Sequence, residues 1–358
     1  MDIAKIESFC INSCFISLFI TTIYYWCKTL FIPNPTYSKS GLVGYGIAFI
    51  FLTSHLIFRW LDSGHFPLSN LYESLLFLAW CLVFLQIYLE IFLKTLFLGV
   101  FTSPALLCLI AFTDLSLPQE LQKSEPLVPA LQSNWLVMHV TVMIASYAAL
   151  LLGCLLSIVY LIFLQVFKVE TEKTTLFDNS QNNGAYPITK KSSNLNQISA
   201  FSENLSDSFP FSKNEVSPEN KFFGQEASIL VEKNKQIEAG TMAFFSEKVE
   251  NTSFLTMLDN LSYRTIGIGF CFLTLGILSG AIWANETWGN YWSWDPKETW
   301  AFITWLTFAT YLHSRLIAGW TGSKPAWIAS FGFIIVWICY LGVNLIGKGL
   351  HSYGFFQL

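Results

Sequence analysis

Long apolar stretches alternate with short polar ones along most of this chain. Eight of them are long enough to cross a bilayer, which takes about 20 residues in a helix. They are Phe9–Phe31, Leu42–Trp60, Leu71–Phe92, Leu96–Phe112, Trp135–Phe167, Thr265–Ala284, Trp300–Gly319 and Trp327–Ile346. The fourth is the shortest, and Pro104 interrupts it. Because lipid satisfies no backbone hydrogen bonds, each stretch is predicted to be a helix. The pattern therefore predicts an all-α, polytopic membrane protein with about eight transmembrane helices.

Charged residues are scarce and unevenly placed. They make up 12% of the 358 residues, against roughly 25% in a soluble domain. Half of them lie between Lys168 and Ser262, which predicts three parts: membrane helices 1–167, a polar insert 168–262 and membrane helices 263–358. The insert is rich in Asn, Ser, Lys and Glu, so we expect it to be mostly disordered. The net charge of −4 argues against a nucleic-acid partner, which requires a basic face.

Eight spans place both termini on the same side of the membrane. Lys and Arg are in excess in the loops of the other side, which include the insert. By the positive-inside rule, the insert then faces the cytoplasm or its equivalent. Both termini and the segment 283–305 are expected on the outer side.

Tryptophan is concentrated in that outer segment, which holds six of the 13 tryptophans. An aromatic belt at the membrane interface is one interpretation. A belt needs only one or two aromatics at each helix end, however, whereas four indoles lie between Trp288 and Trp300. A flat apolar cofactor would bury a large area on such a surface. The segment therefore favours a binding platform, with candidate residues Trp288, Tyr291, Trp292, Trp294, Asp295 and Trp300.

Three of the five histidines are candidate metal ligands. His139, at the outer end of the fifth stretch, and His351, after the last stretch, lie on the side of the Trp-rich segment. Two neutral imidazoles can ligate haem iron axially. His313 lies thirteen residues into the seventh stretch, about 20 Å from its outer end at 1.5 Å per residue. An ionisable residue at that depth is a functional candidate. For each histidine, hydrogen-bonded packing is the alternative.

Four other polar residues have open roles. His65 lies in an outer loop near the same side, and His55 lies within the second stretch, one turn from Arg59. Arg59 and Lys297 are candidates for pairing with haem propionates, since Arg binds carboxylates with two hydrogen bonds. Snorkelling of both side chains to the interface explains their positions equally well.

The segment Trp288-Gly-Asn-Tyr-Trp-Ser-Trp-Asp-Pro-Lys-Glu-Thr-Trp300 resembles the WWD signature of haem-handling proteins in cytochrome c maturation. The chain most resembles the CcsA type of the System II pathway, found in plastids, cyanobacteria and some other bacteria. Further stretches resemble that type too: residues 63–74, 134–139 and 258–264, and the end at His351.

The resemblance implies a subunit that moves haem b across the membrane and presents it for covalent attachment. The acceptors would be the C-x-x-C-H motifs of apocytochromes c, such as cytochrome f and soluble lumenal c-type cytochromes. His139 and His351 would ligate iron in the WWD site. His313 would ligate haem at an earlier, intramembrane site, whose second ligand would lie on a CcsB-type membrane partner. No nucleophile–base pair is recognisable, so the chain is expected to present a cofactor rather than act as a conventional enzyme.

Two further interpretations remain open. The first is a haem exporter with no role in attachment. The second, a structural or proton-conducting subunit of a photosynthetic complex, predicts several intramembrane carboxylates, and only Glu90 and Glu73 come near a span. The 33 phenylalanines, with frequent Ile, Asn and Lys, fit an AT-rich organellar genome, and no Arg-rich transit peptide is visible. We therefore expect the plastid thylakoid membrane, with the insert stromal and the WWD segment and both termini lumenal.

Overall fold

The computed structural model describes residues 3–32, 37, 39–123, 133–182 and 218–346. The chain divides into two compact units. Unit 1 comprises Met1–Phe163 and Leu255–Leu358, and unit 2 comprises Leu164–Phe254. The second unit nearly coincides with the polar insert. The described residues contain helices and no strand, so the all-α prediction is confirmed.

Every apolar stretch lies on a helix. The helices are α1 (Ile3–Phe31), α2 (Ser40–Ser63), α3 (Leu71–Leu93), α4 (Leu96–Ala111), α5 (Gln119–Gln122), α6 (Asn134–Asn182), α8 (Pro218–Trp288), α9 (Pro296–Leu316), α10 (Ser323–Trp337) and α11 (Val343–Ile346). Two π-helical turns, η1 (Phe112–Ser116) and η3 (Ile338–Gly342), extend α4 and α10. Only Asn134–Phe163 of α6 and Leu255–Trp288 of α8 belong to unit 1.

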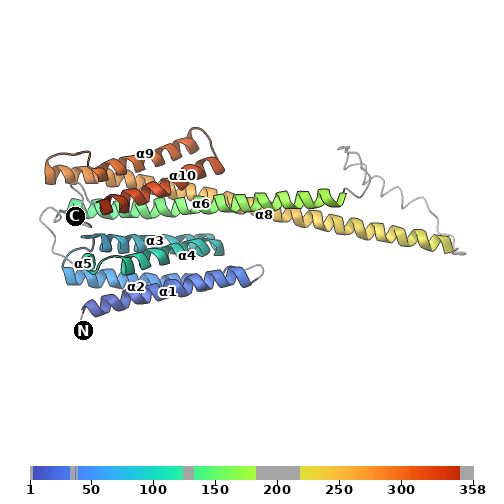
Figure 1. Cartoon of the computed structure of the whole chain (residues 1–358), viewed down its shortest axis with the longest axis horizontal. Helices are drawn as coiled ribbons and strands as arrows, with labels where there is room; N and C mark the ends of the chain where they lie inside the picture. The colour runs from blue at the N-terminus through green and yellow to red at the C-terminus, as the bar shows by residue number, and fades with distance from the viewer. Residues whose placement is uncertain (1–2, 33–36, 38, 124–132, 183–217, 347–358) are drawn as a thin grey trace. The chain divides into compact units, whose positions relative to one another are not determined.

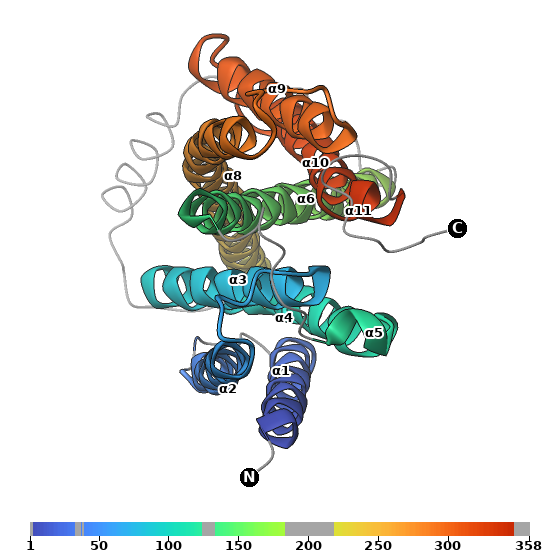
Figure 2. The ribbon, with the colours of Figure 1, turned by 90° about the vertical axis from the view of Figure 1, so that its left-hand side faces the viewer.

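The helices of unit 1 lie side by side in layers (Figure 1). Viewed from the end in Figure 2, α1 and α2 form the first layer and α3 and α4 the next. Next come α6 and α8, and α9 and α10 lie beyond them. Helix α1 packs on α2 and α4, α2 packs on α3, and α9 packs on α10. We call the end at which α6 leaves unit 1 the insert end, and the opposite end the WWD end.

Seven helices within the described ranges are long and apolar enough to cross a membrane. They are α1, α2, α3, α4 with η1, the first part of α6, the last part of α8, and α10 with η3. The chain is therefore a multi-pass membrane protein. Helix α9, which covers most of the seventh predicted span, is 21 residues long but is not apolar enough to be among them. It carries Lys297 and Glu298 in its first turn and His313 and Arg315 in its last.

Pro104 does not break α4. Proline lacks an N–H group, so the carbonyl four residues earlier loses its helical partner. That carbonyl belongs to Val100, and the indole N–H of Trp26 on α1 donates to it at 3.2 Å. An unsatisfied backbone group is costly in lipid. The contact from α1 thus explains how the fourth span tolerates a proline.

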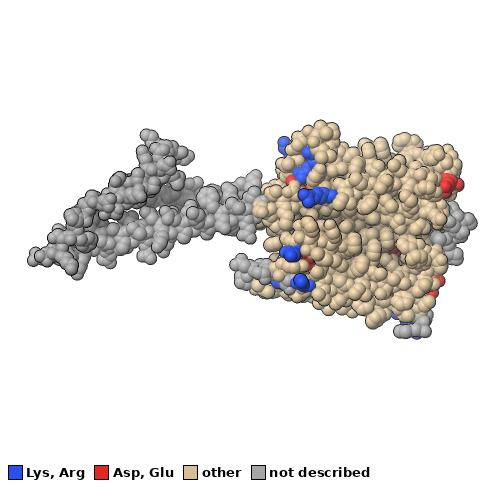
Figure 3. Space-filling model, turned by 180° about the vertical axis from the view of Figure 1, so that it is seen from behind, with Lys and Arg blue, Asp and Glu red and all other residues tan. Residues whose placement is uncertain are grey.

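Basic side chains gather at one end of unit 1, as Figure 3 shows, and that end is the insert end. Lys28 lies in the last turn of α1, Lys94 caps α3, and Arg315 lies in the last turn of α9. Acidic side chains are visible at the opposite end in the same view. The charge asymmetry inferred from the loops is therefore present in the folded bundle.

Two helices extend into the insert, which was expected to be mostly disordered. Helix α6 continues to Asn182 and α8 begins at Pro218, whereas residues 183–217 lie outside the described ranges. Residues 225–250 include five Glu, three Ala and three Lys, residue types with high helix propensity. This local preference favours a helix in a segment of polar composition. Phe254–Leu261, considered either a surface helix or a lead-in to the sixth span, lies within α8, and Leu258 and Leu261 are buried.

Candidate functional site

The WWD signature contains a short loop, Gly289–Asp295, between α8 and α9. Its start is a helix C-terminus: Gly289 has φ +78° and its N–H donates to the Asn285 carbonyl at 2.9 Å. Glycine adopts that left-handed conformation without a steric penalty. The backbone therefore turns sharply after Trp288.

The end of the loop is a helix N-terminus. The Asp295 side chain accepts a hydrogen bond from the Lys297 N–H at 3.4 Å, and the Glu298 side chain accepts one from the Asp295 N–H at 3.3 Å. This is a capping box, with Pro296 at the first helical position. Asp295 is buried and does not line the cavity described next. The Asp-Pro-Lys-Glu part of the signature thus starts α9.

A cavity joins His139 on α6 to the WWD loop. Its walls are mostly apolar, and it is lined by Leu136, His139, Val140, Met143, Tyr147, Ile277, Gly280, Ala281, Trp283, Ala284, Tyr291, Trp292, Lys297, Glu298 and Ala301. Its volume is ≈ 730 Å³ when the open space at its mouth is included. The expected grouping of His139 with this loop is therefore present.

The His139 ring is held against α8. Its Nδ1 lies 2.7 Å from the Gly276 carbonyl oxygen. Because a carbonyl only accepts hydrogen bonds, Nδ1 carries the hydrogen and the lone pair of the ring is on Nε2. Metal-binding histidines are commonly oriented in this way. A Cβ added to Gly280 would lie 2.5 Å from the ring atom Cε1, so only glycine leaves room for the ring.

A second cavity, of ≈ 800 Å³ when the open space at its mouth is included, shares His139, Tyr147 and Lys297 with the first. Its other polar lining residues are Ser69, Asn70, Ser74, Tyr340 and Asn344. The Lys297 ammonium donates to Asn344 Oδ1 at 3.0 Å. Lys297 precedes the apolar part of α9, and burial lowers the pKa of its ammonium. Lys297 and His139 thus stand where the two cavities meet.

Tyr291 and Trp292 face this site. Both line the first cavity, and Trp292 Nε1 is buried without a hydrogen-bond partner among the described residues. An unpaired buried donor costs about 1–3 kcal/mol. Trp294 lines neither cavity, has φ +57° and is 69% exposed, with its ring 5.9 Å from that of Trp292. The loop thus presents one indole inward and one outward.

Trp288 and Trp300 support the loop from its two sides. The Trp288 ring meets the Trp283 ring edge-on at 4.8 Å, and Trp283 lines the cavity. Trp300 packs against the hydrophobic core. Of the six predicted platform residues, the structure brings Tyr291 and Trp292 to the cavity.

Arg59 is not brought to this site. Its Nε donates to Glu73 at 2.9 Å, Nη1 donates to Glu7 at 3.4 Å, and Nη2 donates to the Gln122 carbonyl at 2.5 Å. It lines neither cavity. Two carboxylates and one carbonyl therefore hold the guanidinium away from the two cavities that His139 lines.

The remaining histidines are dispersed. His313 is exposed in the last turn of α9, at the insert end, about 25 Å from the start of that helix at 1.5 Å per residue. His55 is buried, with Nδ1 3.0 Å from the Glu7 carbonyl, and His65 Nδ1 lies 3.1 Å from the Phe66 carbonyl. His351 lies outside the described residues. The structure thus places one candidate iron ligand, His139, at the cavity.

Comparison with known proteins decides the family. A family model described as cytochrome C assembly protein matches residues 68–351. The chain belongs to this family. It is 60% identical over 358 residues to the cytochrome c biogenesis protein CcsA of Chlorella vulgaris, covering 100% of this chain and 99% of the relative. The CcsA proteins of Picosynechococcus and Microcystis aeruginosa are each 45% identical over 356 residues, covering 99% of this chain and 100% of each relative.

This cytochrome c assembly protein has site residues that sequence reasoning missed. Gly276 and Gly280 form the slot for His139, and Tyr340 and Asn344 complete the second cavity. The glycines carried a usable signal, because small residues four apart let membrane helices approach closely. Tyr340 and Asn344 carried no such signal in the sequence. They reach the second cavity only because η3 and α11, which hold them, follow the packed helix α10.

Replacing Gly280 by Ala is expected to lower holocytochrome formation about 10- to 100-fold, the usual cost of disturbing the support of a metal ligand. The added methyl would overlap the His139 ring and move it. The matched control is Gly267→Ala on the same helix, where a Cβ meets nothing within 4 Å. Immunoblots of the chain and haem staining of the cytochromes give the comparison. Equal cytochrome levels in the Gly280→Ala and Gly267→Ala variants would show that Gly280 does not position the His139 ring.

Proposed function

We propose that this chain, which acts in cytochrome c biogenesis, carries haem b at the WWD end and presents it for attachment to apocytochromes c. The observation that carries this proposal is a single cavity holding the Nε2 lone pair of His139 beside Tyr291, Trp292 and Lys297. An imidazole ligand, flat aromatic surfaces and a cation are the groups that an iron porphyrin dicarboxylate requires.

The residues present fit haem in three respects. The walls are apolar, as the porphyrin face demands. Trp292 Nε1 is a buried donor lacking a partner in the described chain, and the Lys297 ammonium is a second donor at the same cavity. Propionate oxygens are acceptors and would satisfy both. His139 would ligate the iron through Nε2.

Attachment requires little chemistry from the protein. Each cysteine thiol of a C-x-x-C-H motif adds across a haem vinyl group, forming a carbon–sulfur bond while the thiol hydrogen goes to the neighbouring carbon, so no atom is lost. What the chain supplies is position: His139 sets the iron, Trp292 and Tyr291 cover one region of the ring, and Lys297 sets its polar edge. Fixing reactants in this way replaces a bimolecular encounter by an effectively intramolecular one.

His351 is proposed as the second axial ligand on the strength of the family resemblance. It follows Asn344, which lines the second cavity, by seven residues. The five residues that come after the end of α11 at Ile346 reach about 18 Å when extended. A chain of that length can bring His351 back to the cavity that His139 lines.

His313 is proposed as a ligand of haem on its way across the membrane. The side chain is exposed on the surface of α9. A partner subunit of the CcsB type would therefore supply the second ligand. Basic residues at the insert end (Figure 3) support a stromal insert and a lumenal WWD end. The plastid thylakoid is the proposed membrane, and cytochrome f is a candidate acceptor.

Haem export without attachment is the competing function. Haem supplied on the outer side of the membrane distinguishes export alone from attachment. In a bacterial host expressing the chain with its partner, the outer side is the periplasm. If the chain only exports haem, haem added to the periplasm should restore cytochromes in cells lacking the chain. Our proposal predicts no restoration, because attachment itself is missing. Wild-type cells measured in parallel give the reference level of haem-stained cytochrome.

A further inference from the structure

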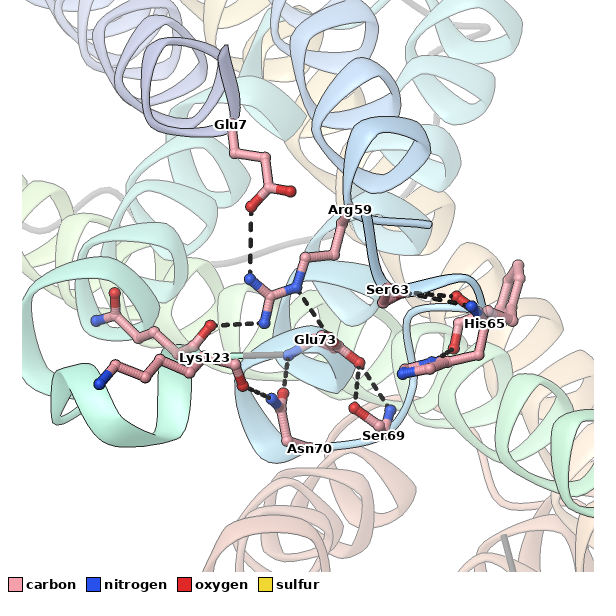
Figure 4. A network of polar contacts seen from close by, with 10 residues as sticks. Glu7, Arg59, Ser63, His65, Ser69, Asn70, Glu73 and Lys123 are labelled. Carbon is pink, nitrogen blue, oxygen red and sulfur yellow. Dashed lines mark hydrogen bonds and ion pairs between the residues drawn. The ribbon is translucent and has the colours of Figure 1, made fainter. Parts of the chain in front are cut away.

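A buried charge network lies at the WWD end of α1, α2 and α3, apart from the aromatic loop (Figure 4). Arg59 is 6% exposed and Glu73 0%. The guanidinium contacts Glu73 at 2.9 Å and Glu7 at 3.4 Å, and stands 5.5 Å from the centre of the Tyr72 ring. Replacing a buried ion pair with apolar residues is often neutral or stabilising. Stability alone therefore does not explain this arrangement.

The far oxygen of Glu73 fixes a turn. While Oε1 accepts from Arg59, Oε2 accepts from the Ser69 backbone N–H and from the Ser69 hydroxyl, both at 2.8 Å. Asn70 caps α3 by accepting from the Glu73 N–H at 2.9 Å, and its own amide donates to the Lys123 carbonyl at 3.1 Å. The three groups that contact the Glu73 carboxylate are thus all hydrogen-bond donors, and two of them belong to Ser69.

That turn is a wall of the second cavity. Leu68, Ser69, Asn70, Leu71 and Ser74 line it, and His139 and Lys297 line it too. The Tyr340 hydroxyl, also in the lining, donates to Ser74 Oγ at 2.9 Å. The Arg59–Glu73 pair therefore lies directly behind the wall of the cavity that holds the candidate iron ligand.

We propose that Glu73, held by Arg59, is a positioning residue for the haem cavity: it sets the Ser69–Asn70 turn as the wall of the cavity that His139 also lines. This inference rests on the proposed function. It also gives Arg59 a role other than a direct contact with haem, because the guanidinium acts through Glu73. Ser69, Asn70 and Glu73 then matter for the shape of the site rather than as ligands.

The test compares Glu73→Gln with Glu90→Gln. Both carboxylates lie on α3 and are 0% exposed, and both accept only from donors. Glu90, however, lies at the other end of the helix and bonds Tyr25 and Gln86. An amide offers one acceptor atom where the carboxylate offered two, so Glu73→Gln must release Arg59 or Ser69. The chain is purified with its partner, and the Soret band and reduction potential of the haem are recorded.

A second readout follows the turn itself. Leu68→Cys is introduced into each background, and the rate at which a water-soluble maleimide modifies the new thiol is measured by peptide mass spectrometry. We expect faster modification and a shifted Soret band and potential for Glu73→Gln, and neither change for Glu90→Gln. If Glu73→Gln fails to accumulate, Ser69→Ala removes one donor without touching the ion pair, and changes in the same direction, of smaller size, are expected.

The possible results distinguish a failure of this inference from a failure of the proposed function. An unchanged rate of thiol modification at position 68 in Glu73→Gln refutes the positioning of the turn. Faster modification with unaltered haem spectra shows that the turn does not shape the haem cavity, which overturns the inference and leaves the proposed function intact. Equal spectral shifts in Glu73→Gln and Glu90→Gln also overturn it, since any buried carboxylate would then act alike. A wild-type complex that binds no haem overturns both.

Discussion

Replacing His139 by Ala is expected to abolish holocytochrome formation and most of the haem that co-purifies with the chain, while the protein still accumulates. The imidazole is the one candidate iron ligand that the described residues bring to the cavity. Its removal leaves a vacant iron position, and imidazole added to the growth medium is expected to restore part of the cytochrome. The measurements are haem staining of cytochromes and the pyridine haemochrome of the purified complex.

His65→Ala is the matched control for this experiment. His65 also lies at the WWD end, but it lines neither cavity and its Nδ1 contacts the Phe66 carbonyl at 3.1 Å. Near-normal cytochrome and haem are expected in this variant. If His139→Ala behaves in the same way, His139 is not a ligand.

His313→Asn is expected to lower co-purified haem strongly and to stop attachment, with the WWD end unchanged. Asn keeps a hydrogen-bonding side chain but is a poor iron ligand, so the variant separates ligation from packing. A packing role would cost roughly 0.6 kcal/mol in a membrane, which function would survive. Thr310→Ala, an exposed position one turn earlier on the same helix, controls for disturbance of the α9 surface. Normal haem content and cytochrome assembly in His313→Asn would remove the transit site.

The helices are predictable because their signal is local. A run of about 20 apolar residues must be a helix in lipid wherever it packs, so the sequence locates all eight stretches. Helix α9 shows the limit: it begins at Pro296 and ends at Leu316, so Lys297 and Glu298 lie in its first turn and His313 lies in its last. A depth counted from one end of a stretch does not show how near the other end is.

The residue types of the site are predictable from the sequence, but most of the contacts between them are not. The link between His139 and the tryptophans follows from their shared side of the membrane. Asp295 starts α9, a role that the Asp-Pro-Lys-Glu sequence itself indicates through its capping box, rather than the cofactor contact expected of it. The partners of Arg59 are beyond local reasoning, because Glu7 lies 52 positions away along the chain and meets it only once α1 has packed on α2.

Axial ligation by His139 is the central claim, and a ligand replacement tests it most directly. The identity of the axial ligand controls the absorption spectrum and potential of haem iron. The measurement is the absorption and magnetic circular dichroism spectrum of the complex carrying His139→Cys, purified beside the wild type. The account predicts that histidine ligation in the wild type is replaced by the signature of a thiolate ligand. A His139→Cys complex that retains the wild-type spectrum would contradict it.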